Sequence, residues 1–318
     1  MTGSIALDRI RGYRGPWIGT IAVLLAASIF ATSGTIIKYL IQGYRLQPLT
    51  VAAVRMTLAA LMLFAVLGVL DRKLLCIQAR DIPFFLLFGL ICVALFQACW
   101  VYAVSLIDVG VATVLNYTSP AWAVLFAWPL LGERLNRRKG LALLLTGAGV
   151  ALIVRIFDAQ FLSLNMAGLL WGLGSGLTYG LYGIFGRRAL GRYSFWTVIT
   201  YTFAAGALFL LVTQLVLSLV LSSVEGSVEA SPSRMVSAFA QPGAALWLVI
   251  LALFPTVVGY ALYTFGLRFM EATVAAILVT VEPVMATLWA IIFLGESLTW
   301  PQIVGGGLVI AGVIALQR

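Results

Sequence analysis

Residues 111–133 read VATVLNYTSPAWAVLFAWPLLGE, and residues 274–296 read VAAILVTVEPVMATLWAIIFLGE. The two stretches align without a gap at an offset of 163 residues, and over positions 111–153 of the alignment 15 of 43 residues are identical. Each stretch is a long apolar run with a proline near its middle and Gly-Glu at its end. A helix of about 20 such residues crosses a bilayer, so the chain contains an internal repeat of membrane-spanning segments.

The composition of the whole chain agrees with a membrane protein. Of its 318 residues, 62% are hydrophobic and 10% are charged, against about 45–50% and 25% in ordinary soluble domains. This balance excludes a soluble enzyme, a disordered protein and a secreted disulfide scaffold. The apolar runs are continuous and do not alternate with polar residues as barrel strands do. The expected fold class is therefore an all-α polytopic membrane protein.

Reading along the chain, we expect ten transmembrane helices. The first follows three arginines in the manner of a signal peptide, but its apolar run is longer than the 7–15 residues of a signal sequence, so it is interpreted as the first span. The ten expected spans are 17–42, 47–70, 82–106, 110–131, 140–157, 165–186, 194–221, 243–267, 272–294 and 300–316.

Lysine and arginine are divided unevenly between the two sides of these spans. Fifteen of the 20 basic residues fall on the side of the termini and four on the other side, while Arg55 lies inside a span. Basic residues favour the cytoplasmic face, so both termini are expected in the cytoplasm and the protein in the cell inner membrane. The net charge of +9 thus indicates orientation in the lipid bilayer, and no nucleic-acid partner is expected.

The repeat divides the chain into two units, residues 1–160 and residues 161–318, with five expected helices each. Because five is odd, the second unit enters the membrane upside down relative to the first. Inverted repeats are a common plan of alternating-access transporters. A duplicated scaffold with another task is the alternative reading.

Two prolines occupy equivalent positions in the fourth and ninth spans. Pro120 and Pro283 each remove a backbone hydrogen bond and free the carbonyl four residues back, at Asn116 and Val279. Matching helix breaks in the two halves point to a binding site near the midplane. A simple packing kink is the alternative for either proline alone.

Two charged residues lie deep inside the expected spans. Glu282 is about 16 Å from either surface, a depth at which a carboxylate must be protonated, paired or facing water. It is a candidate for proton coupling or for binding a substrate amine, or a neutral carboxyl bonded to a neighbouring helix. Arg55 cannot lose its proton, so it snorkels, pairs with a carboxylate such as Glu282 or Asp108, or binds a substrate carboxylate.

Aromatic and uncharged polar side chains also occur at depth in the central helices. They are candidates for the wall of a substrate cavity, with ordinary core packing as the alternative for each. The candidates are Gln97, Trp100, Asn116, Tyr117, Trp122, Trp171, Tyr179, Tyr260 and Tyr263. In the sixth span, glycines at every fourth position (Gly168, Gly172, Gly176, Gly180) predict close approach of another helix.

Catalytic and metal chemistry find little support in the sequence. The chain has no histidine, and Cys76, Cys92 and Cys99 lie in apolar surroundings without the spacing of a metal site. We therefore expect no metal, no cofactor and no enzymatic activity. A nucleotide partner is not expected either, because the chain contains no Walker-type phosphate loop.

At this point the sequence resembles the drug/metabolite transporter superfamily, specifically its EamA-type ten-helix transporters. The resemblance covers nearly the whole chain and is most specific in the doubled proline-to-Gly-Glu spacing. It departs near Thr200, which lacks a charged counterpart to Arg55, and in the long segment 222–242. The residues that carry it are Arg55 in AAVRMTLAALML, Ser119-Pro120 with Gly132-Glu133, Glu282-Pro283 with Gly295-Glu296, Lys38, and Tyr102-Ala103.

The resemblance implies a ten-helix inner-membrane carrier of two inverted repeats that exports amino acids, amines, metabolites or drugs without ATP. Together with the aromatic residues, it favours an exporter of amino acids, aromatic ones included, or similar small organic solutes. Protons are the candidate coupling ion. The alternatives are a drug or amine efflux carrier, a facilitated uniporter, a membrane-embedded enzyme and a membrane protein without flux.

Overall fold

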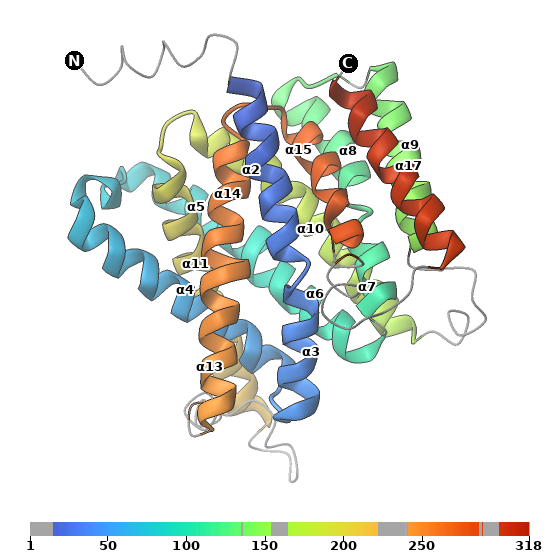
Figure 1. Ribbon diagram of the computed structural model, residues 1–318. Coiled ribbons are helices and arrows are strands. Elements are labelled where there is room, and N and C mark those ends of the chain that lie inside the picture. Colours follow the sequence, from blue (N-terminus) through green and yellow to red (C-terminus); the bar gives the residue numbers. More distant parts are fainter. Residues whose placement is uncertain are drawn as a thin grey trace.

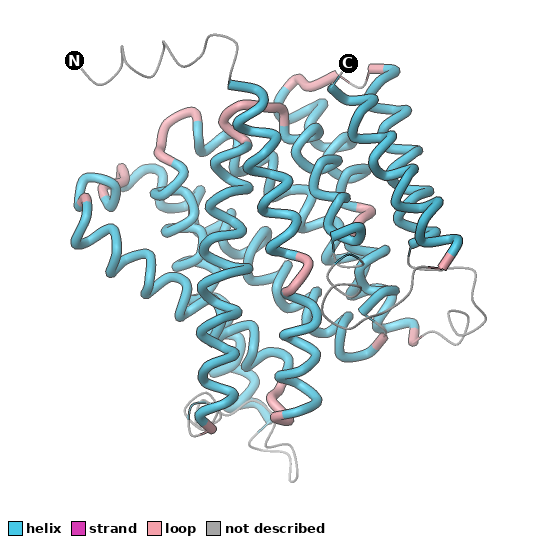
Figure 2. The backbone as a smooth tube through the Cα atoms, viewed as in Figure 1, coloured by secondary structure: helices cyan, strands magenta, loops and turns pink. Residues whose placement is uncertain are grey.

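The computed structural model describes residues 15–107, 109–134, 136–153, 165–221, 239, 241–285, 288 and 299–317. Within these ranges the chain forms helices and no strand (Figures 1 and 2), which confirms the expected all-α class. The α-helices are α2 (Gly15–Phe30), α3 (Ser33–Gly43), α4 (Pro48–Leu70), α5 (Ile82–Gly89), α6 (Phe96–Leu106), α7 (Val109–Asn116), α8 (Ser119–Leu131), α9 (Arg137–Ile153), α10 (Met166–Leu190), α11 (Phe195–Leu221), α13 (Pro242–Leu251), α14 (Gly259–Gly266), α15 (Ala272–Leu278) and α17 (Trp300–Gln317). Short 3-10 helices are η1 (Arg72–Leu75), η2 (Ala79–Asp81) and η6 (Val279–Val281), and π-helices are η3 (Leu90–Leu95) and η5 (Ala252–Val258).

Five helices among the described residues are long and apolar enough to cross a membrane. They are Trp17–Gly43, Pro48–Leu70, Ala79–Leu106, Phe195–Leu219 and Pro242–Gly266. The other expected spans also coincide with helical residues, although the described part of the ninth is short. The start of α2 and the end of α17 lie at the same end of the bundle (Figure 1), as an even number of spans requires.

The two halves pack against each other in a pattern that repeats after exchange of the halves. The last helix of the first half, α9, lies along its repeat equivalent α17, and α4 lies along α11 (Figure 1). The remaining pairs are reciprocal, because α6 packs on α10 while α14 packs on α2. This arrangement relates the two halves by a two-fold operation.

Glycine contacts between α9 and α17 have the same reciprocity. A Cβ atom on Gly149 would lie 2.8 Å from Cγ2 of Val309, and one on Gly312 would lie 2.7 Å from Cγ2 of Thr146. Gly312 and Val309 are the residues that follow Gly149 and Thr146 by 163 positions. The contact therefore maps onto itself when the halves are exchanged, as it does across a pseudo-two-fold axis.

Two π-helical turns interrupt the third and eighth spans at equivalent places. The turn η3 joins α5 to α6, and η5 joins α13 to α14. Adding the repeat offset of 163 residues to η3 gives residues 253–258, which lie within η5. A π-helical turn opens the backbone hydrogen-bond ladder and is frequent at functional sites. The sequence analysis did not predict either turn.

The first span differs from the continuous helix expected over 17–42. It breaks after Phe30 and resumes as α3, a pink interruption in Figure 2. At the break, the hydroxyl of Thr32 donates to the carbonyl oxygen of Ile29 at 2.8 Å. A threonine that bonds locally to the backbone competes with the helical ladder, and no proline marks the position.

Several sequence expectations fall outside the described residues. The boundary between residues 160 and 161 is among them, so the repeat units 1–160 and 161–318 stay predictions. Asp108, Gly295-Glu296 and most of the segment 222–242 also lie outside the described residues.

Candidate functional site

The fourth and ninth spans are interrupted directly before their prolines. In the fourth, α7 ends at Asn116 and α8 begins at Ser119, so that Pro120 lies in the first turn of a new helix. In the ninth, the 3-10 turn η6 separates α15 from Glu282-Pro283. The prolines thus begin helical segments instead of kinking continuous helices, because the first turn of a helix needs no proline N–H.

The glycines of α10 pack against the interruption in the fourth span. A Cβ atom on Gly176 would lie 2.6 Å from the carbonyl oxygen of Leu115, and one on Gly180 would lie 2.7 Å from that of Ser119. The prediction of close helix approach at this glycine row is confirmed. The α10 backbone comes this near only because these positions carry no side chain.

A central cavity of about 30 Å³ lies where the interrupted helices of the two halves meet. This volume has room for about one or two water molecules. Its lining comes from the first, second, third and fourth spans of the first half and from the sixth, eighth and ninth spans of the second half. The lining residues are Phe30, Ser33, Arg55, Phe96, Trp100, Asn116, Tyr179, Tyr260 and Glu282.

Arg55 presents its guanidinium group to this cavity from α4. Its side chain is buried, with Nε donating to Oγ1 of Thr256 at 2.5 Å and Nη1 donating to Oε1 of Gln97 at 3.3 Å. Thr256 belongs to the π-helical turn η5, and its own hydroxyl donates to the carbonyl oxygen of Leu251. Among the described residues, no carboxylate lies within ion-pair distance of Arg55.

Glu282 lies on the opposite repeat and faces the same cavity. Its side chain is partly buried, and the hydroxyl of Tyr117, beside the interruption in the fourth span, is near enough to interact with it. The guanidinium of Arg55 is near enough to act on Glu282 electrostatically without contacting it. The cavity therefore contains one cation and one carboxyl group that are not joined in a salt bridge.

Two residues of the cavity lining carry a buried polar atom that lacks a hydrogen-bond partner within the described structure. They are Asn116, through Oδ1, and Tyr179, through its hydroxyl. Buried polar groups are bonded in the great majority of cases. Two unpaired polar groups at one cavity make it a candidate site for a polar ligand.

Aromatic rings form one wall of the cavity. Tyr179 stacks on Phe96 at a centroid distance of 5.3 Å and on Tyr263 at 5.9 Å. Tyr260 meets Phe30 edge to face at 5.1 Å. Tyr263 thus supports the wall from behind Tyr179 and is not itself in the lining.

Two tryptophans expected in the cavity lie elsewhere. Trp122 donates through Nε1 to the hydroxyl of Thr118 and stacks on Phe126, which holds the indole beside α8. Trp171 stacks on Tyr102 and lines a second, apolar cavity of about 360 Å³ between α4, α6, α10 and α11. Sequence position gave their depth but not the face of the helix on which they lie.

Four residues of the site were not predicted from the sequence: Phe30, Ser33, Phe96 and Thr256. Phe30 and Ser33 flank the unexpected break in the first span. Phe96 begins α6 after the π-helical turn, which sets the direction of its side chain. The only available signal for Thr256 was its position after Pro255, a proline inside an apolar run.

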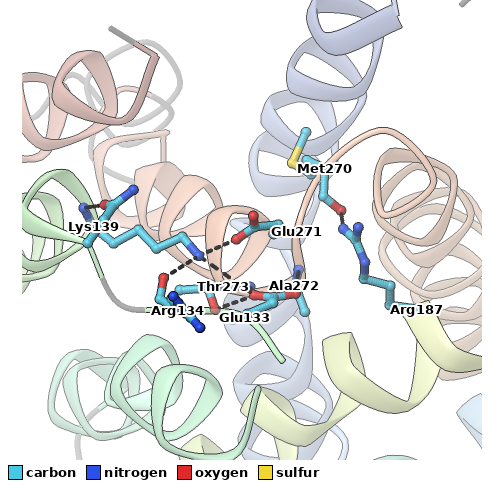
Figure 3. Close-up of polar contacts among 9 residues, drawn as sticks. Glu133, Arg134, Lys139, Arg187, Met270, Glu271, Ala272 and Thr273 are labelled. Carbon is cyan, nitrogen blue, oxygen red and sulfur yellow. Dashed lines mark hydrogen bonds and ion pairs between the residues drawn. The ribbon is translucent and has the colours of Figure 1, made fainter. Parts of the chain in front are cut away.

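A second polar cluster closes one end of the bundle (Figure 3). The carboxylate of Glu133 accepts hydrogen bonds from the backbone N–H groups of Ala272 and Thr273, at 2.9 and 3.2 Å. The buried Lys139 bonds to the carboxylate of Glu271 and lies 4.0 Å from Glu133. The Gly-Glu motif of the first half therefore caps the interrupted helix of the second half.

The backbone places Glu133 at this position. Gly132 ends α8 in the left-handed conformation, with φ at 70°, which favours glycine. The chain turns there, and the Glu133 carboxylate reaches the N-terminus of α15, where unpaired N–H groups and the helix dipole favour a negative charge. The segment that leads into α15 is also held from α10, where Arg187 donates to the carbonyl oxygen of Met270 (Figure 3).

The likeness to known proteins agrees with this architecture. An inner membrane transporter of Salmonella typhimurium, YicL, whose function is uncharacterised, is 25% identical over 94% of this chain and 95% of its own length. A probable terminal-alkyne amino-acid exporter of Streptantibioticus cattleyicolor is 28% identical over 95% of this chain and 93% of its own. A crystal structure with 19% sequence identity superposes with a TM-score of 0.66 over 95% of this chain and 96% of the other, and shows that the fold is shared.

The family profile matches the chain twice. The EamA-like transporter family is found at residues 17–155 and again at residues 166–317, one match for each half. The family fold has two repeats, in agreement with the reciprocal packing described above. This multi-pass membrane protein belongs to the EamA-like transporter family.

Proposed function

We propose that this protein is a secondary transporter that exports amino acids, aromatic ones included, or similar small metabolites across the inner membrane by alternating access. One observation carries the proposal: the central cavity joins the interrupted helices of both repeats and holds a cationic and a carboxyl group. Sites of this kind, at the repeat interface, serve solute binding in secondary transporters.

The small volume of the cavity supports alternating access. A space of about 30 Å³ does not hold an organic solute, so the two halves have to move apart for binding. The capped end at Glu133 (Figure 3) is one side on which such a movement has a defined contact to break. The amino-acid assignment draws support from the mixed charge of the cavity and from the relative named as a probable amino-acid exporter.

Counterflow in proteoliposomes tests the proposal. Vesicles containing the purified protein are loaded with an unlabelled amino-acid mixture, and uptake of radiolabelled phenylalanine, tyrosine, tryptophan, leucine and alanine is measured. We expect saturable uptake of at least one of them. The variant Leu144→Ala, at a largely exposed position of α9, is the matched control and should transport as the wild type does. Well-folded protein that exchanges none of these solutes contradicts the proposal.

Proton coupling is a separate element of the proposal and is assigned to Glu282. A pH gradient should accelerate uptake by the wild type, and Glu282→Gln should remove this acceleration because glutamine does not bind or release a proton. Transport by Glu282→Gln that equals the wild type at every pH value removes Glu282 from the mechanism. A wild type that is insensitive to the gradient but active in counterflow is a uniporter.

A further inference from the structure

We infer that the site around this cavity, once the two halves have moved apart, binds an α-amino acid by its two poles, with Arg55 holding the carboxylate and Glu282, together with Asn116, holding the ammonium group. The inference rests on the proposed function and assigns the parts of its binding site. It is carried by the juxtaposition, around one cavity, of the Arg55 guanidinium, which is in no ion pair within the described structure, with Glu282 and the unpartnered amide oxygen of Asn116.

The guanidinium of Arg55 retains hydrogen-bond capacity for a ligand. Of its five N–H donors, the structure assigns one on Nε to Thr256 and one on Nη1 to Gln97. Both partners are neutral, so the positive charge has no counter-charge in contact. The remaining N–H groups on the two terminal nitrogens form the planar fork that binds a carboxylate with two parallel bonds.

The lining of the cavity also presents acceptors. Glu282 provides a carboxyl group and Asn116 an unpartnered amide oxygen. An ammonium group carries three N–H donors and no acceptor. The carboxylate oxygens of Glu282 and the amide oxygen of Asn116 accept hydrogen bonds, as a group that only donates requires.

The separation of the two charges selects a ligand that carries both. Arg55 and Glu282 face one cavity but form no ion pair within the described structure. A solute with only an amine leaves the guanidinium without a counter-charge, and a solute with only a carboxylate leaves Glu282 without one. An isolated charge in an apolar, membrane-buried site is costly, so the zwitterion binds better than either truncated analogue.

The inference is tested with three solutes that share a phenethyl group: phenylalanine, phenethylamine and 3-phenylpropionate. The labelled solute is an amino acid that the wild-type protein exchanges in the counterflow experiment above. Each of the three unlabelled solutes is added in turn, and its inhibition of the labelled uptake is measured. We expect both analogues to compete about 100-fold less well than phenylalanine, as the loss of one partner from a buried charge pair predicts. Equal competition by all three solutes overturns the assignment while leaving the transporter function intact.

Substitutions then assign the poles individually. Arg55→Gln should abolish the preference for phenylalanine over phenethylamine, and Glu282→Gln should abolish the preference over 3-phenylpropionate. Arg55→Lys keeps the charge without the planar fork, so it should retain part of the preference for phenylalanine over phenethylamine. This variant replaces Arg55→Gln in the experiment if Arg55→Gln does not fold. If Arg55→Gln retains the wild-type ratio, the carboxylate binds elsewhere. If the wild type exchanges no amino acid at all, it is the proposed function that fails.

Discussion

Glu133 and Thr273 are joined across the two halves of the protein, with Oε2 of Glu133 accepting from the hydroxyl of Thr273 at 2.6 Å. Thr273 lies in the first turn of α15, and the same chain continues through η6 to Glu282. The carboxylate that closes one end of the bundle is therefore connected, through a short stretch of helix, to the carboxyl group in the cavity.

Loss of this cap should open the end of the bundle at which Glu133 lies. Glu133→Ala removes three acceptor contacts at a helix N-terminus, a change that costs about 1 kcal/mol and raises an open population about fivefold. The measurement is the labelling rate of a thiol introduced by Ser33→Cys, with a membrane-impermeant maleimide added on the Glu133 side. The background carries Cys76→Ser, because Cys76 is exposed.

The neighbouring residue offers the control for this experiment. Arg134 is exposed, and Arg134→Ala removes a side chain that takes no part in the cap. In this variant the thiol introduced by Ser33→Cys should be labelled at the same rate as in the protein that keeps both Glu133 and Arg134. An equal rate in Glu133→Ala would show that the contact does not hold the two halves together.

Gly176→Ala should damage the protein through packing alone. Its new methyl group would meet the carbonyl oxygen of Leu115 at 2.6 Å, and overpacking of this kind costs about 1–3 kcal/mol. We expect a lower thermal unfolding temperature in detergent and slower transport. Gly147→Ala is the matched control, because a Cβ atom there has nothing within 4 Å; it should be neutral or slightly stabilising. A stable, fully active Gly176→Ala protein would contradict the close approach of α10 to the interrupted helix.

Thr256→Val should disturb Arg55 without changing the size of the side chain. It removes the hydroxyl to which Nε of Arg55 donates, and a buried donor without a partner costs about 1–3 kcal/mol. The expected result is a raised KM for the transported amino acid together with a lower unfolding temperature. Thr256→Ser keeps the hydroxyl and should stay close to the wild type. Equal KM values for the two variants would mean that Thr256 does not orient the guanidinium.

The two cavities distinguish two tryptophans of similar depth. Trp100 lines the central cavity, and Trp171 lines the apolar one. Trp100→Ala should raise KM about tenfold, the effect of losing roughly 1.4 kcal/mol of contact, whereas Trp171→Ala should change stability and leave the order of preferred solutes unaltered. If only Trp171→Ala changed the order of preferred solutes, the solute would bind in the apolar cavity and not in the central one.

The spans were predictable because length and continuous apolarity are properties of the local sequence. The inverted plan was predictable because the repeat is visible at a constant offset. The bonds of the site were not. Arg55 and Thr256 lie 201 residues apart, and Glu133 and Thr273 lie 140 residues apart, and no local pattern encodes either contact.

The direction of side chains was equally hidden from the sequence. Trp122 and Trp100 are both deep and aromatic, and only the turn at Tyr117–Thr118 and the π-helical turn η3 decide which one faces the cavity. The proline at position 120 did predict a disturbance of the fourth span. The break after Phe30 came without proline or glycine at that point and depends on the packing of α2 and α3 in the folded protein.

The matching π-helical turns η3 and η5 have the same effect on the helix that follows each of them. A π-helical turn bonds to the fifth residue along instead of the fourth, and so accommodates one residue more than the regular helix does. The two turns occupy equivalent positions at the repeat offset, although the sequences LICVAL and ALFPTVV have little in common. Each turn therefore rotates the face that the next helix presents, and α6 and α14 begin at equivalent residues, Phe96 and Gly259.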